Sequence, residues 1–303
     1  MSMKNPKAKL IRVGHSPDPD DAFMFYALAH EKIDMRGFKV EHVIEDIESL
    51  NQRALKGELE VTAVSCHAYA YLADKYLVMR AGSSVGDGYG PILVRRKEYG
   101  EAQEKDAVLR TPDSIQKVAV PGKLTTAYLA LQMFAKSESK APHTVLRTPF
   151  EVGFTPFDKI FDAVRSGEAD LGLIIHEGQI TYEKEGMELA ADLGRWWLET
   201  TKLPLPLGID IIRRDLGEET IRSFAKLFKE SIEYALNHRK EALEYASQFG
   251  RGIADDLNDR FVAMYVNART VDLGTDGEAG FRLLFDKAYE YKIIPAKVNL
   301  EFI

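Results

Sequence analysis

The chain has 303 residues, of which 45% are hydrophobic and 29% are charged. This length can bury a large core and is more typical of two domains than of one. The 40 basic and 47 acidic residues give a net charge of −7, without the basic run expected of a nucleic-acid-binding protein. No stretch approaches the roughly 20 apolar residues of a membrane-spanning helix. We therefore expect neither nucleic acid nor membrane as a partner, and the sequence gives no indication of oligomeric state.

The amino terminus and the cysteine content indicate the compartment. Arg12 interrupts the first apolar run directly after Leu10 and Ile11, whereas a secretory signal needs about 7–15 consecutive apolar residues. The single cysteine, Cys66, cannot form an internal disulfide, as is usual in a reducing compartment. We therefore expect a cytoplasmic protein.

Two strand-to-helix junctions, one in each half of the chain, are typical of an α/β protein that binds a ligand. The predicted strand 10–13 leads into an apolar helix over 21–30, and the predicted strand 117–120 leads into a helix over 127–136. Free backbone N–H groups at the start of a helix bind anions. Both junctions are therefore candidate anion sites.

A second pattern also occurs once in each half: a helix, a glycine, a buried strand and a polar end. The first copy is a helix over 46–56 followed by a strand over 59–64. In the second copy a helix begins at Thr155-Pro156 with Phe157 on its apolar face, and a strand follows over 170–175. Such nearly continuous apolar strands predict parallel sheets that are covered on both faces.

Ser65 and His176 directly follow these two strands. Ligands of open α/β sheets bind beyond the carboxyl ends of the strands, so both residues are expected to line a cleft, from opposite lobes. Histidine has the unperturbed pKa nearest neutrality and can take and return a proton. His176 is therefore the candidate general base; the alternative is a structural histidine that forms a hydrogen bond at a strand end.

The chain crosses twice between the predicted lobes, at 90–94 and at 203–208. We predict a discontinuous first lobe, residues 1–92 and 209–303, and a second lobe, residues 93–208. This is a two-lobed α/β architecture with a central cleft and two hinge crossings.

Thr125 and Thr126 open the predicted helix of the second lobe. Their hydroxyl and backbone groups could bind a carboxylate or a sugar hydroxyl, or they could simply cap the helix. The adjoining Gly122-Lys123 does not belong to a phosphate-binding loop, because the G-x-x-x-x-G-K-[ST] pattern is absent.

Asp18, Asp20 and Asp21 gather before the first predicted helix and at first suggest a metal site. Asp20 and Asp21, however, lie where acidic residues cap a helix and favour its dipole. No EF-hand or H-E-x-x-H spacing accompanies them. We therefore do not expect a metal at this position.

Four motifs together are specific enough to indicate a family. They are Ser16-Pro17-x-Pro19-x-Asp21-x-Phe23-x-Phe25-Tyr26-Ala27-Leu28, Val120-Pro121-Gly122-x-x-Thr125-Thr126-Ala127-Tyr128, Gly172-Leu173-Ile174-Ile175-His176-Glu177 and Asp192-Leu193-Gly194-x-Trp196-Trp197. With these motifs the chain resembles, along nearly its whole length, the 1,4-dihydroxy-6-naphthoate synthases of the futalosine route to menaquinone. That family has the type II periplasmic-binding-protein fold.

The resemblance implies a cofactor-independent carbon–carbon lyase that acts on cyclic dehypoxanthine futalosine, a small anionic aromatic metabolite. It places the family's proton acceptor on His176. The substrate contacts that the motifs carry over fall on Ser16, Ala63, Val64, Ser65, Thr125 and Thr126.

Three residues depart from the family's pattern. Asp18 and Asp20 stand where the family usually has a cysteine and an asparagine, and His15 is also atypical. Carboxylates disfavour a neighbouring anionic ligand unless they bind its hydroxyl groups or point away from it. Two alternatives therefore stay open: a related enzyme such as a chorismate dehydratase, and a cytoplasmic solute-binding protein of the same fold.

Overall fold

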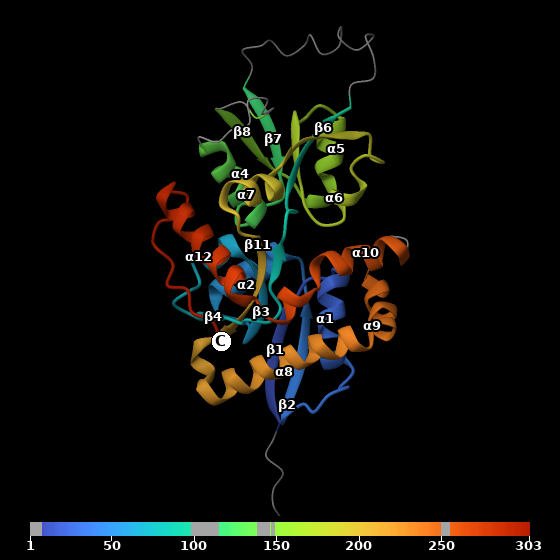
Figure 1. Ribbon diagram of the computed structural model, residues 1–303, viewed down its shortest axis with the longest axis vertical. Coiled ribbons are helices and arrows are strands. Elements are labelled where there is room, and N and C mark those ends of the chain that lie inside the picture. Colours follow the sequence, from blue (N-terminus) through green and yellow to red (C-terminus); the bar gives the residue numbers. More distant parts are fainter. Residues whose placement is uncertain (1–7, 98–114, 138–145, 147–148, 250–254) are drawn as a thin grey trace, which may run out of the picture. The chain divides into compact units, whose positions relative to one another are not determined.

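The computed structural model of the chain describes residues 8–97, 115–137, 146, 149–249 and 255–303. Part of the amino-terminal segment used above to judge export lies outside these ranges. The chain divides into two compact units, each with its own sheet (Figure 1).

The first unit comprises Met1–Gly86, Pro206–Asp286 and Ile294–Ile303. Its strands follow the order β2-β1-β3-β11-β4, and β5 also pairs with β11. β1 is parallel to β2 and β3, whereas β11 is antiparallel to β3 and β4. The prediction of a parallel sheet is therefore wrong for the part of this sheet formed by β11 and β4. There β11, which is distant from β3 in the sequence, pairs with it in the antiparallel direction. The strands are β1 (Lys9–His15), β2 (Phe38–Ile44), β3 (Val61–Ser65), β4 (Tyr76–Val78), β5 (Ser84–Gly86) and β11 (Leu205–Arg213).

Helices cover both faces of this sheet. Val13 of β1 packs in one core with Phe23 of α1 and Phe228 of α8, and these two helices lie side by side (Figure 1). The next residue, Gly14, faces the other way, since a Cβ atom there would lie 2.8 Å from Leu50 of α2. The helices that begin in this unit are α1 (Pro19–Ala29), α2 (Ile47–Lys56), α3 (Cys66–Tyr69), α8 (Glu218–Asn237), α9 (Arg239–Ala246), α10 (Asp255–Tyr265), α11 (Ala268–Val271) and α12 (Gly274–Glu290).

The helix predicted over 46–56 is confirmed, together with the glycine that ends it. The Asp46 side chain caps α2 by accepting a hydrogen bond of 3.1 Å from the Ser49 N–H group. Gly57 ends the helix with a φ of 73°, a left-handed conformation that glycine adopts without a steric penalty. Because α2 ends at Gly57, β3 can begin a few residues later, at Val61, and its carboxyl end is at Ser65.

The second unit comprises Asp87–Leu205 and Lys287–Ile293. Its strands follow the order β10-β6-β9-β7-β8. β7 is parallel to β8 and β9, whereas β6 is antiparallel to β9 and β10. This sheet is thus also mixed, with its parallel part around β7. The strands are β6 (Ile92–Arg96), β7 (Gln116–Val120), β8 (Phe150–Phe154), β9 (Leu171–Ile174) and β10 (Met187–Asp192).

The helix predicted to begin at Thr155-Pro156 begins later. Phe157–Lys159 forms a 3₁₀ turn without a side-chain cap, and α5 starts at Ile160. The reason lies in the sheet: the Thr155 N–H group bonds to the Val120 carbonyl oxygen at 2.9 Å, so Thr155 continues the strand pairing and does not cap a helix. The helices of this unit are α4 (Thr126–Lys136), α5 (Ile160–Arg165), α6 (Gly178–Thr181) and α7 (Leu193–Thr201).

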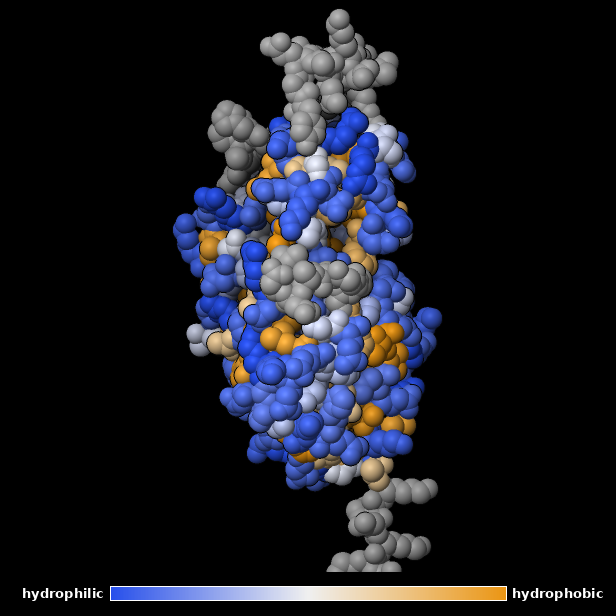
Figure 2. All heavy atoms as spheres, turned by 90° about the vertical axis from the view of Figure 1, so that its right-hand side faces the viewer, coloured by the Kyte–Doolittle hydropathy of each residue, from blue (hydrophilic) through white to orange (hydrophobic). Residues whose placement is uncertain are grey.

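The surface drawn in Figure 2 is mainly hydrophilic, and its hydrophobic residues form small separate patches. The large hydrophobic side chains that are exposed come from different elements, for example Leu10 of β1, Phe154 of β8 and Leu189 of β10. Scattered exposed hydrophobic residues are normal for a globular protein. Among the described residues, no helix is both long and apolar enough to cross a membrane.

Candidate functional site

A network of short hydrogen bonds fixes the loop between β1 and α1. The Ser16 N–H group donates to Asp21 Oδ2 at 2.7 Å, and the Ser16 hydroxyl donates to Asp18 Oδ2 at 3.0 Å. The same hydroxyl oxygen accepts from the Asp18 N–H group at 3.1 Å. Ser16 is 3% exposed, so this structure shows it as part of the loop's internal framework; its role as a substrate contact stays a prediction.

At the carboxyl end of β3, Ser65 is held by a residue that sequence reasoning missed. The Asn51 side chain, from α2, donates to Ser65 Oγ at 3.0 Å and accepts from the Ser65 N–H group at 3.1 Å. Asn51 is completely buried. A buried amide that satisfies both groups of one residue fixes that residue's position. Ala63 and Val64 are also buried, and their contact with substrate stays a prediction.

Two imidazole rings lie beside this loop: that of His15, which is buried, and that of His42, which is partly buried. His15 stacks on Phe25 with ring centroids 4.7 Å apart, and its Nε2 lies 3.1 Å from His42 Nδ1. The pKa of each ring is lowered to about 4, by burial in both rings and, in His15, also by the neighbouring His42. Both rings are therefore neutral at physiological pH and take no proton there.

The same end of the first sheet contains acidic side chains in unfavourable surroundings. Burial raises the pKa of the Asp20 carboxyl well above its usual value, and the charges of Asp21 and Asp18 raise it further. Asp210 of β11 is 1% exposed, and burial, together with Asp21 and Asp20, raises its pKa well above the usual range. The described residues contain no group of three or more His, Cys, Asp or Glu side chains that could hold a metal ion.

In the second unit, Thr125 caps α4. Its Oγ1 accepts from the Tyr128 N–H group at 3.2 Å, and its hydroxyl donates to the Gly122 carbonyl at 2.9 Å. The capping interpretation of Thr125 is thus confirmed. Thr125 and Thr126 are both buried, and their contact with substrate stays a prediction.

His176 follows β9 in a left-handed turn, with a φ of 53°. Its carbonyl oxygen accepts from the Gln179 N–H group at 3.1 Å. A non-glycine residue in this conformation costs roughly 1–2 kcal/mol and is uncommon outside functional or tightly constrained positions. The side chain is partly exposed, so the ring is not sealed in the core of its unit.

The Phe157 ring lies against His176, with centroids 5.2 Å apart and planes at 65°. Sequence reasoning placed Phe157 on the apolar face of a helix; in the structure Phe157 begins the 3₁₀ turn instead and is partly exposed. Such an edge-to-face contact fixes the orientation of an imidazole. The signal that could have found it is the proline between strand and helix, which favours an extended exit from β8.

His176 and the two threonines follow neighbouring parallel strands. β7 pairs with β9 in parallel, with Val118 opposite Leu171 and Ala119 opposite Gly172. The loop 121–125 after β7 and the turn 175–177 after β9 therefore leave the sheet at the same edge. This is the edge at which ligands of such sheets bind.

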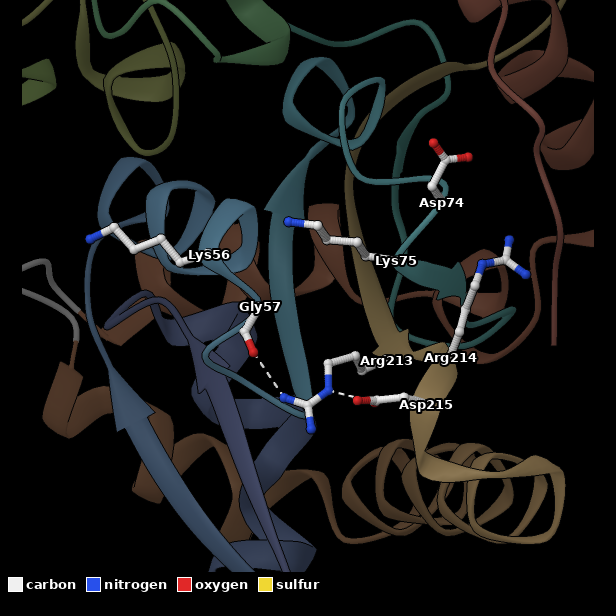
Figure 3. Close-up of a pocket in the computed structure, with 7 residues that line it drawn as sticks. All are labelled: Lys56, Gly57, Asp74, Lys75, Arg213, Arg214 and Asp215. Atoms are coloured by element: carbon white, nitrogen blue, oxygen red, sulfur yellow. Dashed lines mark hydrogen bonds and ion pairs between the residues drawn. The ribbon is translucent and has the colours of Figure 1, made fainter.

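A pocket of about 400 Å³ lies elsewhere, at the amino end of β3. Figure 3 shows that its cations do not converge, since Lys56 and Arg214 lie at opposite sides of the view. Arg213 bonds to Asp215 at 2.6 Å and to the Gly57 carbonyl at 2.8 Å. The cationic side chains of the pocket each form an ion pair with a carboxylate or a hydrogen bond with a carbonyl oxygen. They are Lys56, Lys75, Arg213 and Arg214. We therefore do not place the active site there.

Comparison with solved structures defines the class of protein. The chain superimposes on the alkanesulfonate-binding protein SsuA from Xanthomonas axonopodis pv. citri with a TM-score of 0.67, over 95% of each chain, at 14% identity. It superimposes on protein AF1704 from Archaeoglobus fulgidus with a TM-score of 0.81, at 44% identity, over 94% of this chain and 98% of that one. The predicted periplasmic-binding-protein fold is thus confirmed.

The chain belongs to the menaquinone biosynthesis family, whose model matches residues 11–290. A 1,4-dihydroxy-6-naphthoate synthase of Thermus thermophilus is 39% identical over 282 residues, which are 92% of this chain and 93% of that protein. The synthase of Streptomyces coelicolor is 34% identical over 289 residues, 95% of this chain and 96% of its own length. The family resemblance that the sequence motifs indicate is confirmed.

Proposed function

We propose that the chain is the lyase that forms 1,4-dihydroxy-6-naphthoate from cyclic dehypoxanthine futalosine in menaquinone biosynthesis, with His176 as its general base. The observation that carries this proposal is the position of His176. It stands partly exposed at the carboxyl end of β9, in a left-handed turn, in a chain 39% identical to a synthase of this name. We place the reaction in the cytoplasm, because the single cysteine, Cys66, cannot form an internal disulfide, as is usual in a reducing compartment.

The chemistry asks little of the protein besides one base and a fixed substrate. In the proposed step a neutral imidazole takes a proton from carbon, the electron pair of that C–H bond forms a new double bond, and a carbon–carbon bond breaks. The electron pair of the broken bond stays with the departing fragment, which takes the proton back from the imidazolium. The ring then becomes aromatic, which supplies the thermodynamic drive. A positioned general base contributes typically 10²–10⁴-fold to a rate, and correct orientation contributes the rest.

In this proposal the remaining predicted residues bind the substrate. Thr125 and Thr126 leave the second sheet at the same edge as His176, where main-chain N–H groups at the start of α4 favour the substrate's carboxylate. Ser16 and Ser65 contribute from the first unit, with Ala63 and Val64 beside Ser65. The predicted hinge between the lobes belongs to the proposal as well, because closure would exclude water from the reaction.

The test is turnover by the purified protein, followed by chromatography and mass spectrometry of the naphthoate. We expect His176→Ala to lower kcat at least 1,000-fold and to change substrate affinity less than threefold. His238→Ala is the matched control, since that ring is exposed at the end of α8 and stacks on Tyr234. We expect it to leave turnover unchanged.

Other outcomes would favour the alternatives. Turnover of chorismate in place of the futalosine derivative would assign a dehydratase. Tight binding without turnover would indicate a solute-binding protein, as the structural likeness to SsuA allows. Undiminished turnover in His176→Ala would reject the assigned base while leaving the reaction in place.

A further inference from the structure

Several buried polar atoms in the first unit have no hydrogen-bond partner among the described residues. They include Asp20 Oδ1, Asp210 Oδ1, Ser83 Oγ, Ser84 Oγ and Asn258 Oδ1. Ser83 is 0%, Asp210 1% and Asn258 2% exposed. Natural proteins pair the large majority of their buried polar groups, so a set of unpaired atoms in one region suggests a polar partner that binds there.

Contacts between elements bring these atoms to one region. α10, which contains Asn258, packs against both α1 and β5, and β5 pairs with β11. A Cβ atom on Gly82 would lie 2.3 Å from Asp210 Oδ2. Gly208 lies two residues before Asp210 in β11 and so shares its face of the sheet; a Cβ atom there would lie 3.9 Å from Ser84 Cβ. The segment 82–84 therefore passes over Asp210.

This region lies at the carboxyl end of the parallel strands. Gly208 is opposite Ser65, the last residue of β3, and Asp210 is opposite Ala63. Asp20 is in the first turn of α1, just after β1 ends. The unpaired atoms are therefore at the edge of the sheet where ligands of such folds bind, and two of the residues that carry them, Asp20 and Ser84, are only partly buried.

Charge decides which ligand chemistry fits. Burial and neighbouring carboxylates favour the protonated form of Asp20 and Asp210. A protonated carboxyl offers one O–H donor and one acceptor oxygen, as the serine hydroxyls also do. These groups match a ligand hydroxyl, which is likewise both donor and acceptor. A carboxylate on the ligand would face the charges of Asp18 and Asp21 and would be repelled.

We propose that Asp20, with Asp210 and Ser84 behind it, forms a subsite for the hydroxyl groups of a sugar-like ring. This inference rests on the proposed function in one respect only, since the proposed substrate carries a ribose-derived ring. It assigns the aromatic carboxylate of that substrate to other residues. In this proposal Asp20 makes the carboxyl end of the first sheet selective for ligand hydroxyl groups over ligand carboxylates.

Saturation-transfer NMR on the full chain tests the subsite with two probes, D-ribose and benzoate. Ribose has ring hydroxyls and no carboxylate, and benzoate has the reverse. We expect Asp20→Leu to reduce transfer to ribose at least fivefold and to leave transfer to benzoate unchanged. Asp20→Asn, which keeps a donor and an acceptor, should retain ribose transfer within twofold. Asp74→Leu, an exposed carboxylate at the opposite end of the sheet, is the matched control and should change neither.

The outcomes separate this inference from the proposed function. Turnover by a protein that shows no transfer to ribose overturns the subsite and leaves the reaction standing. Transfer to ribose without turnover supports the subsite and contradicts the reaction. The subsite is also overturned if Asp20→Leu reduces saturation transfer to ribose and to benzoate equally, or if Asp20→Asn loses saturation transfer to ribose. If Asp20→Leu does not fold, Ser84→Val takes its place, with at least a threefold loss of ribose transfer expected.

Discussion

The two ends of the first sheet differ in how completely their acidic side chains are paired. At the amino end of β3, Glu60 accepts hydrogen bonds from the Arg12 main chain and guanidinium at 2.7–3.0 Å, and Arg213 lies 3.5 Å from it. At the carboxyl end, Asp20 Oδ1 and Asp210 Oδ1 have no partner within the described part of the chain. Complete pairing favours stability, whereas unpaired buried groups persist where a ligand or a reaction uses them.

Within the first unit, the largest effect is expected at Asn51, whose side chain contributes both to stability and to the position of Ser65. Asn51→Leu removes both hydrogen bonds that the Asn51 side chain forms with the buried Ser65. We expect the free energy of unfolding to fall by about 2–3 kcal/mol and kcat/KM to fall about 100-fold, since small displacements at a site can have this effect. Urea unfolding and steady-state kinetics measure the two.

Gln52→Leu is the control on the same helix. Its side chain donates to Glu48 on the exposed face, so we expect a change below about 0.5 kcal/mol. If Asn51→Leu kept full turnover, the end of β3 would be structural only, and the contrast between the two ends would lose its functional meaning.

Much of the fold could be predicted because its signals are local. The Asp46 cap and the glycine after Lys56 bound α2, and nearly continuous apolar runs mark β3 and β9. The position of β11 carries no such signal. Residues 205–213 pair with β3 and β4, more than 120 residues earlier in the chain, and a strand's apolar pattern does not reveal which neighbour it pairs with or in which direction.

The site shows the same limit. His176 could be predicted from its place after an apolar strand, but its contact with Phe157 depends on a 3₁₀ turn. Asn51 looks in sequence like any polar residue of an amphipathic helix, and only the fold shows that it is buried against Ser65. Asp210 was detectable, because a single carboxylate stands inside the apolar run Ile209–Ile212.

Glu60→Gln tests the amino end, and here stability alone should change. Burial acts to raise the pKa of Glu60, but hydrogen bonds from Arg12 outweigh it and hold the pKa below the usual value. We expect a loss of about 2 kcal/mol at pH 7 with kcat/KM unchanged. Because the folded pKa is depressed, this contribution is present above the unfolded pKa and is lost as pH falls through the folded pKa. Unfolding at pH 7 and pH 3 should show the difference shrink; reduced turnover would contradict a purely structural role.

Asp210→Asn tests the carboxyl end and should show the reverse pH dependence. Its pKa is raised in the folded state, so above its unfolded pKa near 3.8 the folded state binds more protons than the unfolded state, and stability falls as pH rises. Asparagine does not titrate. We therefore expect the variant to gain about 1 kcal/mol relative to the parent between pH 4 and pH 8. A difference that stays flat over this range would show that Asp210 is ionised and paired, contrary to the contrast.

The smallest effect is expected in the pocket at the amino end. Lys75 donates to the Leu55 carbonyl at 2.6 Å in an exposed position, and Lys56 lies 3.8 Å from Glu58. Exposed pairs of this kind contribute about 0–1 kcal/mol. The double variant Lys56→Met and Lys75→Met should therefore change stability by less than about 1 kcal/mol and kcat/KM by less than twofold. A tenfold loss of kcat/KM would instead move the substrate's anionic group to the amino end. The paired charges there would then be the functional ones, and the unpaired carboxyls near Ser65 would need another explanation.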